Sequence, residues 1–435
     1  MTSMGAARQP DDKAEVTLRE CPGCGMFQLE PAIQPGHTAQ CHRCGTTLRT
    51  ARRHPLEHSL ALSVAALILL AVMCLSTLMT VRSSGIVHQA GIFSGPVELT
   101  RRGMSGLAVV VVFVTVLAPL VKLAGTIYVL LRLHEANPPR HLRRVFVIVE
   151  RLTTWSMVEV LVFGVFVAYV KLGDLVKIEL DAGVYALLAL TVVTVWADGW
   201  LDREAIWNIF DKDRTRDGTR RAFASGKVAA QAIGCETCTL VAVPEGPGAP
   251  CPRCGSPLHT RKPDSIAWTW ALLIAAAVFY LPANLYPVLT VMQLGTGQPS
   301  TIMGGVRELI QTQMYPLAAL VFFASIAVPM LKMVGLTAML VSAQTGYTRW
   351  LHDRTRLYHI ICRIGRWSMI DIFMESLLGA LVQFGGVVTI EPGIGAVAFC
   401  AVVILTIFAA ETFDPRLMWD TAEAKTSIRG AQAAA

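Results

Sequence analysis

The chain has 435 residues, of which 53% are hydrophobic and only 16% are charged, and its mean hydropathy is +0.51. Soluble domains carry roughly 25% charged residues, so this composition excludes an ordinary soluble domain and indicates a membrane protein with several spans. The formal net charge of +7 is distributed over the loops, which favours a role in membrane topology over nucleic-acid binding.

The first 58 residues are polar and contain two Cys-x2-Cys pairs, Cys21 with Cys24 and Cys41 with Cys44. We therefore expect no cleavable signal peptide in this segment. Two such pairs at this distance are typical of a metal site, and four thiolates suit a closed, structural Zn²⁺ site. A rubredoxin-like iron site uses the same four ligands, so iron is the alternative metal.

Eight apolar runs follow, each long enough to cross a bilayer at about 20 residues per helix. Their lengths match helices and not the ten-residue alternating strands of a membrane β-barrel. The sequence thus predicts an all-α polytopic membrane protein with eight transmembrane helices. The predicted spans are approximately 59–81, 106–131, 145–170, 182–200, 266–292, 316–343, 358–384 and 394–413.

The distribution of Arg and Lys predicts the orientation of these spans. The loops after the second, fourth and sixth spans, within 132–144, 202–221 and 348–366, are rich in Arg, whereas 386–393 contains neither Arg nor Lys. Basic loops remain in the cytoplasm, and an even number of spans places both termini there. Disulfides between the module cysteines are disfavoured in that reducing compartment.

The second half of the chain repeats the first. Residues 41–125 align with 251–335 at an offset of 210 without a gap, and the offset becomes 212 from Trp155 to Trp207. A second cysteine module, Cys235, Cys238, Cys251 and Cys254, precedes the second set of spans. Each half therefore reads as one zinc ribbon followed by four spans, in a parallel repeat.

This repeat divides the chain into five parts, with the boundary between the halves in the linker near 226–234. The expected parts are an N-terminal zinc ribbon (1–54), a first four-helix transmembrane repeat (55–207), a linker with the second zinc ribbon (208–262), a second four-helix repeat (263–420) and a C-terminal tail (421–435).

Each half also carries a lysine inside an apolar run, Lys122 in APLVKLAG and Lys332 in VPMLKMVG. An ionised side chain in the bilayer costs about 2.5–3.5 kcal/mol even on the mildest scale, so a partner is expected. The next span of the first half brings Ser156 and Glu159 from the same side. We therefore predict that Lys122 pairs with Glu159; the alternative is a lysine that snorkels to the headgroups.

In the second half, Ser368, Asp371 and Glu375 share one helix face because they are spaced i, i+3 and i+7. Glu375 lies about 12 Å along this span, near the depth of Lys332, which predicts a pair between these two residues. Asn284 lies between two prolines in LPANLYPVL, a stretch that the first half lacks. This asymmetry suggests a more specialised second half, although a merely tolerated helix kink is equally compatible with it.

The doubled combination of cysteine pairs, four spans, the APLVKL/VPMLKM motif and the WSMVE/WSMID motif resembles the paraquat-inducible protein A family (PqiA/LetA), from Cys21 to Trp419. The resemblance implies a protein of the inner membrane of Gram-negative bacteria, with cytoplasmic zinc ribbons. It also implies a partner, an MCE-domain protein that forms a tunnel across the periplasm, and phospholipid as cargo.

The leading hypothesis is therefore lipid transport, in which the chain loads lipid into such a tunnel or receives it. The sequence contains no GxxxxGK[ST] motif, so ATP hydrolysis is not expected, and the chain is not expected to be an enzyme. Proton coupling at Glu375 or Asp371 is then the most economical driving force. Two alternatives are a rubredoxin-like membrane redox protein and a non-transporting assembly or sensor protein whose ribbons bind a cytoplasmic partner.

Overall fold

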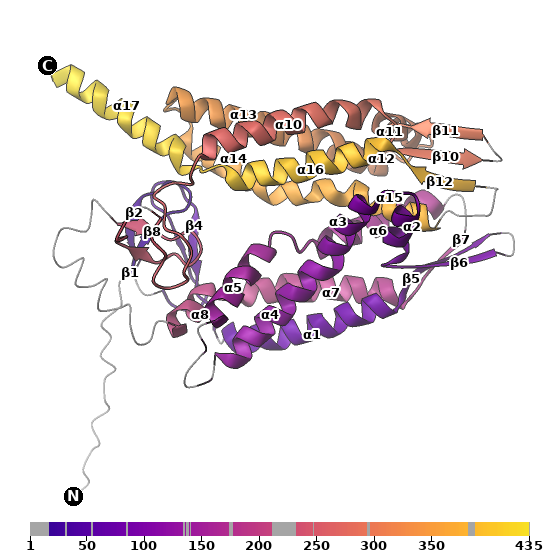
Figure 1. Ribbon diagram of the computed structural model, residues 1–435, viewed down its shortest axis with the longest axis horizontal. Helices are drawn as coiled ribbons and strands as arrows, with labels where there is room; N and C mark the ends of the chain where they lie inside the picture. Colours follow the sequence, from indigo (N-terminus) through magenta and orange to yellow (C-terminus); the bar gives the residue numbers. More distant parts are fainter. Residues whose placement is uncertain are drawn as a thin grey trace, which may run out of the picture.

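The computed structural model describes residues 17–434 except 31–32, 54, 84–85, 134, 136–138, 140, 174–176, 211–231, 247, 294–295 and 382–387. Most of the predicted linker near 226–234 lies outside the described residues. The long helices run side by side in two groups, one from each half of the chain, with the cysteine modules at one end and two small β-sheets at the other (Figure 1).

The first half begins with two antiparallel hairpins, which are β1 (Thr17–Glu20) with β2 (Phe27–Glu30) and β3 (Thr38–Gln40) with β4 (Thr47–Thr50). The elements that follow are α1 (Pro55–Leu75), β5 (Thr77–Ser83), β6 (Ile86–Gly91), α2 (Ser94–Arg101), α3 (Ser105–Val112), η1 (Phe113–Leu117), α4 (Ala118–Arg132), α5 (His141–Leu152), α6 (Val158–Gly173), β7 (Lys177–Leu180), α7 (Ala182–Trp200) and α8 (Arg203–Phe210).

The second half has the same order of elements after its own cysteine module. These elements are β8 (Ile233–Gly234), β9 (Val241–Ala242), α10 (Ser265–Leu285), β10 (Leu289–Gln293), β11 (Thr296–Ser300), α11 (Ile302–Gln311), α12 (Tyr315–Phe322), η2 (Phe323–Ala327), α13 (Val328–Thr345), α14 (Leu351–Ile364), η3 (Gly365–Met369), α15 (Ile370–Leu381), β12 (Val388–Pro392), α16 (Ile394–Thr412) and α17 (Arg416–Ala434).

Six helical stretches of the described chain are long and apolar enough to cross a membrane. They are Pro55–Leu75, Ser105–Arg132, Ala182–Trp200, Ser265–Leu285, Tyr315–Thr345 and Ile394–Thr412. The predicted spans 145–170 and 358–384 need correction, because each is broken into two helices at the WSM motif. One face of α5 and of α14 carries charged side chains, and the remaining helices α6 and α15 have only 16 and 12 residues.

The prediction of an all-α chain also needs correction, because two three-stranded antiparallel sheets extend past one end of the helices. Strand β5 pairs with β6 and β7, and β10 pairs with β11 and β12. The apolar runs predicted as spans 59–81 and 266–292 therefore end as helices at Leu75 and Leu285 and continue as strands. A hydropathy window does not separate a helix from an apolar strand that directly follows it.

Two helices contain a π-helical turn at the same position of the repeat, η1 before Pro119 and η2 before Pro329. Proline cannot donate the backbone hydrogen bond of a regular helix, and a π turn accommodates this loss. The hydroxyl groups of Thr115 and Ser325 donate to the carbonyls one turn earlier, at 2.7 Å in both halves. The same π-helical turn thus occurs in both halves of this chain.

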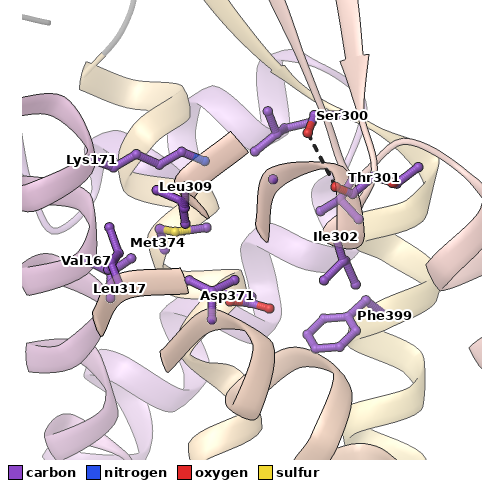
Figure 2. A pocket seen from close by; sticks show the side chains of 14 residues that line it. Val167, Lys171, Ser300, Thr301, Ile302, Leu309, Leu317, Asp371, Met374 and Phe399 are labelled. Atoms are coloured by element: carbon purple, nitrogen blue, oxygen red, sulfur yellow. Dashed lines mark hydrogen bonds between the residues drawn. The ribbon is translucent and has the colours of Figure 1, made fainter. Parts of the chain in front are cut away.

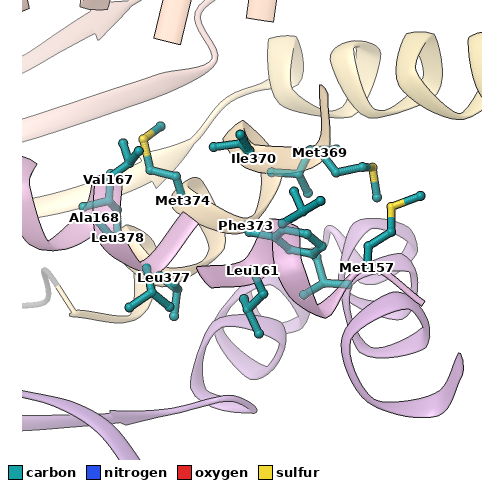
Figure 3. Close-up of a cluster of buried hydrophobic side chains, with 14 of the residues drawn as sticks. Met157, Leu161, Val167, Ala168, Met369, Ile370, Phe373, Met374, Leu377 and Leu378 are labelled. Atoms are coloured by element: carbon teal, nitrogen blue, oxygen red, sulfur yellow. The ribbon is translucent and has the colours of Figure 1, made fainter. Parts of the chain in front are cut away.

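The halves meet along α6 and α15, where apolar side chains from both form one cluster (Figure 3). Met157 and Leu161 come from the first half, and Phe373 and Leu377 come from the second. Gly164 permits the close approach, because a Cβ there would lie 2.8 Å from the Cβ of Phe373. The seam between the halves is therefore tightly packed in its middle.

Candidate functional site

The eight cysteines of the two modules form two compact groups of four buried sulfurs. The ligands predicted from the sequence are all present: Cys21, Cys24, Cys41 and Cys44 in one group, and Cys235, Cys238, Cys251 and Cys254 in the other. The closest Sγ–Sγ distances are 3.5 and 3.6 Å in the first group and 3.5 Å twice in the second. Four thiolates around tetrahedral zinc at 2.3 Å would lie about 3.8 Å apart, so both groups can hold a zinc-type ion.

Backbone turns with positive φ form the knuckles of these modules. Gly25, Gly45 and Gly255 have φ between 72° and 78°, and their N–H groups donate to the carbonyl of the first cysteine of each pair. Thr239 occupies the fourth such position with φ 58°. These turns direct backbone groups toward the sulfurs, as the Cys-x2-Cys spacing requires.

The modules pack crosswise on the two halves. The sulfurs of the first module lie against Trp419 and Leu351 of the second half, and Thr46 shares a 3.2 Å hydrogen bond with His359. The second module packs against an aromatic cluster of the first half that includes Phe146 and Trp207. Each module therefore buries apolar surface of the half to which it does not belong in sequence.

A buried arginine, Arg416, connects these parts. Its guanidinium group donates to Asp414 at 2.8 Å, to Glu20 of the first module at 3.1 Å and to Glu236 of the second module. Burial alone would raise the pKa of the Asp414 carboxyl, but the hydrogen bonds and charge of Arg416 outweigh burial and hold this pKa below its usual value. One cation thus ties both cysteine modules to the start of α17.

The two intramembrane lysines have partners other than the predicted ones. Lys122 donates to Asp198 of α7 at 2.6 Å, and Lys332 donates to the carbonyl of Gly365 at 2.8 Å and to Thr406 at 3.3 Å. The predicted pairs with Glu159 and Glu375 therefore need correction. The break before α15 exposes the Gly365 carbonyl to Lys332, and a glycine at this position leaves room for the lysine side chain.

Of the other predicted polar residues, Ser156 and Glu159 lie at the start of α6 and Asn284 lies near the end of α10. Ser156 is buried in the turn before α6, and Glu159 is half-buried in the first turn of that helix. Asn284 donates to the carbonyl of Tyr280 at 2.9 Å within α10, which continues through Pro282. The Pro-Asn-Pro stretch therefore marks the end of a helix and the start of β10, and does not break the helix in its middle.

The carboxylates of α15 lie in the seam between the halves. Asp371 and Glu375 are 7% and 3% exposed, and their charges interact with that of Lys171 of α6. Among the described residues, Asp371 Oδ1, Glu375 Oε1 and the Ser368 hydroxyl have no hydrogen-bond partner. Buried polar atoms without partners are costly, so these groups indicate a site where a proton, water or ligand binds.

Asp371, but not Glu375, lines a small cavity of about 40 Å³ toward the strand end of the helices. Figure 2 shows Lys171 entering from α6 and Asp371 from α15, with Leu309 and Met374 between them in this view. The lining is otherwise mostly apolar, and its volume suffices for one or two water molecules. The arrangement combines an apolar wall with one cation and one carboxylate.

Lys171 and Asp198 were not identified as site residues from the sequence. Both lie at the ends of predicted spans, where charged residues are common and carry little information. The repeat itself contained one signal: Asp198 aligns at the offset of 212 with Ala410, so only one of the two lysines has a carboxylate at that position.

A larger cavity, of about 860 Å³, opens at the end of the molecule that carries the cysteine modules. Three parts of the chain line it: the turn around Thr153 and Trp155, the second module at Glu236, and α14 and α16 with Lys332 beside them. The two cavities therefore lie on opposite sides of the polar residues in the seam.

Comparison with known proteins gives a consistent result over most of the chain. A family described as paraquat-inducible protein A matches residues 56–211 and 266–423. The intermembrane transport protein PqiA of Escherichia coli K12 is 33% identical over 403 residues, which cover 92% of this chain and 95% of the relative. No solved structure matches significantly.

Two further relatives match over a similar length of the chain. The lipophilic envelope-spanning tunnel protein A of Escherichia coli K12 is 32% identical over 406 residues, 93% of this chain and 92% of the relative. A probable intermembrane transport protein of Haemophilus influenzae is 26% identical over 410 residues, 92% of this chain and 94% of the relative.

Proposed function

The chain belongs to the paraquat-inducible protein A family, and on that premise we propose that it is the inner-membrane component of an MCE-type lipid transport system. It would load phospholipid into a periplasm-spanning MCE tunnel or receive lipid from it. The names of the relatives, which refer to intermembrane transport and to a lipophilic tunnel, support transport over the redox and sensor alternatives.

In this proposal the chain crosses the membrane eight times, as two repeats of four helices with both termini in the cytoplasm. Six crossings are the long apolar helices, and the other two are α6 and α15, which at about 24 and 18 Å are short for a 30 Å hydrocarbon core. Their position in the seam supports this assignment, because neighbouring helices cover their polar groups. The cysteine modules would be cytoplasmic zinc ribbons, and the two three-stranded sheets would face the periplasmic partner.

The observation that carries the proposal is that Asp371 and Glu375 are both buried in the seam, each with one carboxylate oxygen that has no hydrogen-bond partner, and that Asp371 lines a mostly apolar cavity. Ionisable residues at such depth are costly and mark ion or substrate pathways in membrane proteins. Each carboxylate is neutral when it binds a proton, and a neutral seam would open more easily to an acyl chain. We therefore propose that lipid movement is coupled to protonation at these two residues.

The test is rescue of envelope integrity in cells that lack the native gene, with variants produced at wild-type levels. Asp371→Asn and Glu375→Gln should each fail to rescue, because neither side chain can then exchange a proton. The matched control is Asp353→Asn, which changes an exposed carboxylate on α14 in the same way. Full rescue by both buried variants would refute proton coupling at this site.

A further inference from the structure

The 860 Å³ cavity at the ribbon end of the seam is lined by several cationic side chains, and the proposed function assigns no role to them. Four cations line it: Arg151 of α5, Lys262 after the second ribbon, Lys332 of α13 and Arg363 of α14. Pockets of about 300–1,000 Å³ are the usual size for small-ligand sites. Cations from four separate elements thus converge on one cavity of suitable size.

Lys332 is the deepest of these cations. It is only 2% exposed, and both of its hydrogen-bond partners, Gly365 and Thr406, are uncharged. Arg151 and Arg363 are exposed at the rim, and neither forms an ion pair within the described part of the chain. Three of the four cations therefore have no anionic partner in the described structure.

The carboxylates that line the same cavity do not neutralise these three cations. Glu150 pairs with Arg203 at 3.2 Å, and Glu236 pairs with Arg416. Glu411 lies beside Lys262, whose ammonium group donates to the Glu411 backbone carbonyl at 2.5 Å. The carboxylates are thus matched by Arg203, Arg416 and Lys262, and the cavity keeps an excess of positive charge.

We propose that this cavity binds a phosphate-type anion, held by Arg151 and Arg363 at the rim and by Lys332 at the floor. Arginine forks match phosphate oxygens in a bidentate manner, and a lysine adds a point charge. The apolar part of the wall, at Trp155 and Ile407, suits the carbon chain that follows the phosphodiester of a phospholipid. The bound phosphate group could belong to a lipid of the cytoplasmic leaflet, and that assignment rests on the proposed transport function. Binding of free phosphate does not depend on that function.

The test uses the purified full-length protein in a neutral detergent and measures the rate at which a maleimide labels Cys362. This cysteine is exposed and lines the cavity, and mass spectrometry of the labelled peptide separates it from the other cysteines. The probes are dioctanoyl phosphatidylglycerol, dioctanoylglycerol with the same chains but no phosphate, and inorganic phosphate. The two variants are Arg151→Gln and Arg363→Gln, each made singly. The control is Arg356→Gln, which changes an exposed position of α14 outside the cavity.

We expect phosphatidylglycerol to slow the labelling of Cys362, and the two rim substitutions to weaken this protection on the order of tenfold each, while Arg356→Gln leaves it unchanged. Protection by inorganic phosphate alone would support the anion site with free phosphate as its source. Equal protection by dioctanoylglycerol, or protection that survives both rim substitutions, would overturn the proposal. Because labelling reports binding and not transport, a failure of lipid transport would leave this result unaffected.

Discussion

The two halves of the chain place a lysine at the same position of the repeat and surround it differently. Lys122 has a carboxylate partner, Asp198, whereas the residue that corresponds to Asp198 beside Lys332 is Ala410. Conversely, the positions of Asp371 and Glu375 hold Glu159 and Phe163 in the first half. The lysine of the first half thus has a carboxylate partner from its own half, whereas both hydrogen-bond partners of Lys332 are uncharged.

The ribbon end shows a second difference between the halves. Glu204 of α8 and Arg416 of α17 occupy equivalent positions at the offset of 212, but their charges are opposite. Glu204 accepts from Arg19 and forms an ion pair with Arg49 of the first ribbon, and Arg416 donates to Glu20 and Glu236. Ion pairs therefore connect both halves to the ribbons. In the first half a glutamate binds ribbon arginines, and in the second half an arginine binds ribbon glutamates.

The largest expected effect concerns the metal centres, because structural zinc contributes about 10 kcal/mol or more to folding. Cys44→Ser and Cys254→Ser should each lower bound zinc from about two ions per chain to about one. Since the ribbons pack crosswise, Cys44→Ser should expose the second half near Trp419, and Cys254→Ser should expose the first half near Trp207.

Elemental analysis measures the metal, and limited proteolysis locates the exposed half. Iron in place of zinc, with a coloured protein, would revive the redox alternative. Cleavage in the same half as the substituted ribbon would contradict the crosswise arrangement.

Removal of Arg416 should have the next largest effect. Arg416→Ala leaves Asp414 buried without its cation and leaves Glu20 with Arg261 alone, which should lower the free energy of unfolding by about 3–5 kcal/mol. Glu204→Ala should cost less, because Arg19 keeps its 2.8 Å pair with Glu30. Thermal unfolding in detergent compares the two variants, and equal losses would show that the two anchors are equivalent.

A carboxylate can also be grafted from the first half into the second. Ala410→Asp would place an acid beside Lys332 as Asp198 lies beside Lys122, and the resulting pair should weaken anion binding in the cavity on the order of tenfold. Ala410→Asn is the control of nearly equal size without charge. Unchanged protection of Cys362 in the aspartate variant would show that Lys332 does not take part in anion binding.

Loss of the first-half pair should have the smallest effect. Asp198 is 43% exposed, so Asp198→Asn should change the free energy of unfolding by only about 1 kcal/mol, and transport should persist. A chemical denaturation series in detergent measures the first quantity, and rescue of envelope integrity measures the second. A complete loss of rescue would show that the pair of Lys122 and Asp198 in the first half is needed for transport.

Much of this architecture was predictable from the sequence, for reasons that can be stated for individual residues. The cysteine spacing identified all eight candidate ligands, because two thiolates on one knuckle need that separation. The apolar runs located six long helices. Long apolar segments and short-range spacing are local signals, and they need no knowledge of what lies across the fold.

The partners of the buried charges were not predictable in this way. Lys332 and Glu375 have similar depths along their helices, but depth does not fix which faces meet. Helix α15 begins after the break at Gly365, and its Asp371 lines the same cavity as Lys171 of the other half. The apolar run 358–384 gave no sign of this break, because tertiary packing decides whether a buried segment continues as one helix.

The central claim is that the second half carries the working site and the first half a structural copy of it. Its most direct measurement is rescue of envelope integrity by Lys332→Met and Lys122→Met, each produced at wild-type levels and with the metal content of the wild type. The account predicts that Lys332→Met fails and that Lys122→Met rescues nearly as well as the wild type. Equal rescue by the two variants, or failure of Lys122→Met alone, would contradict it.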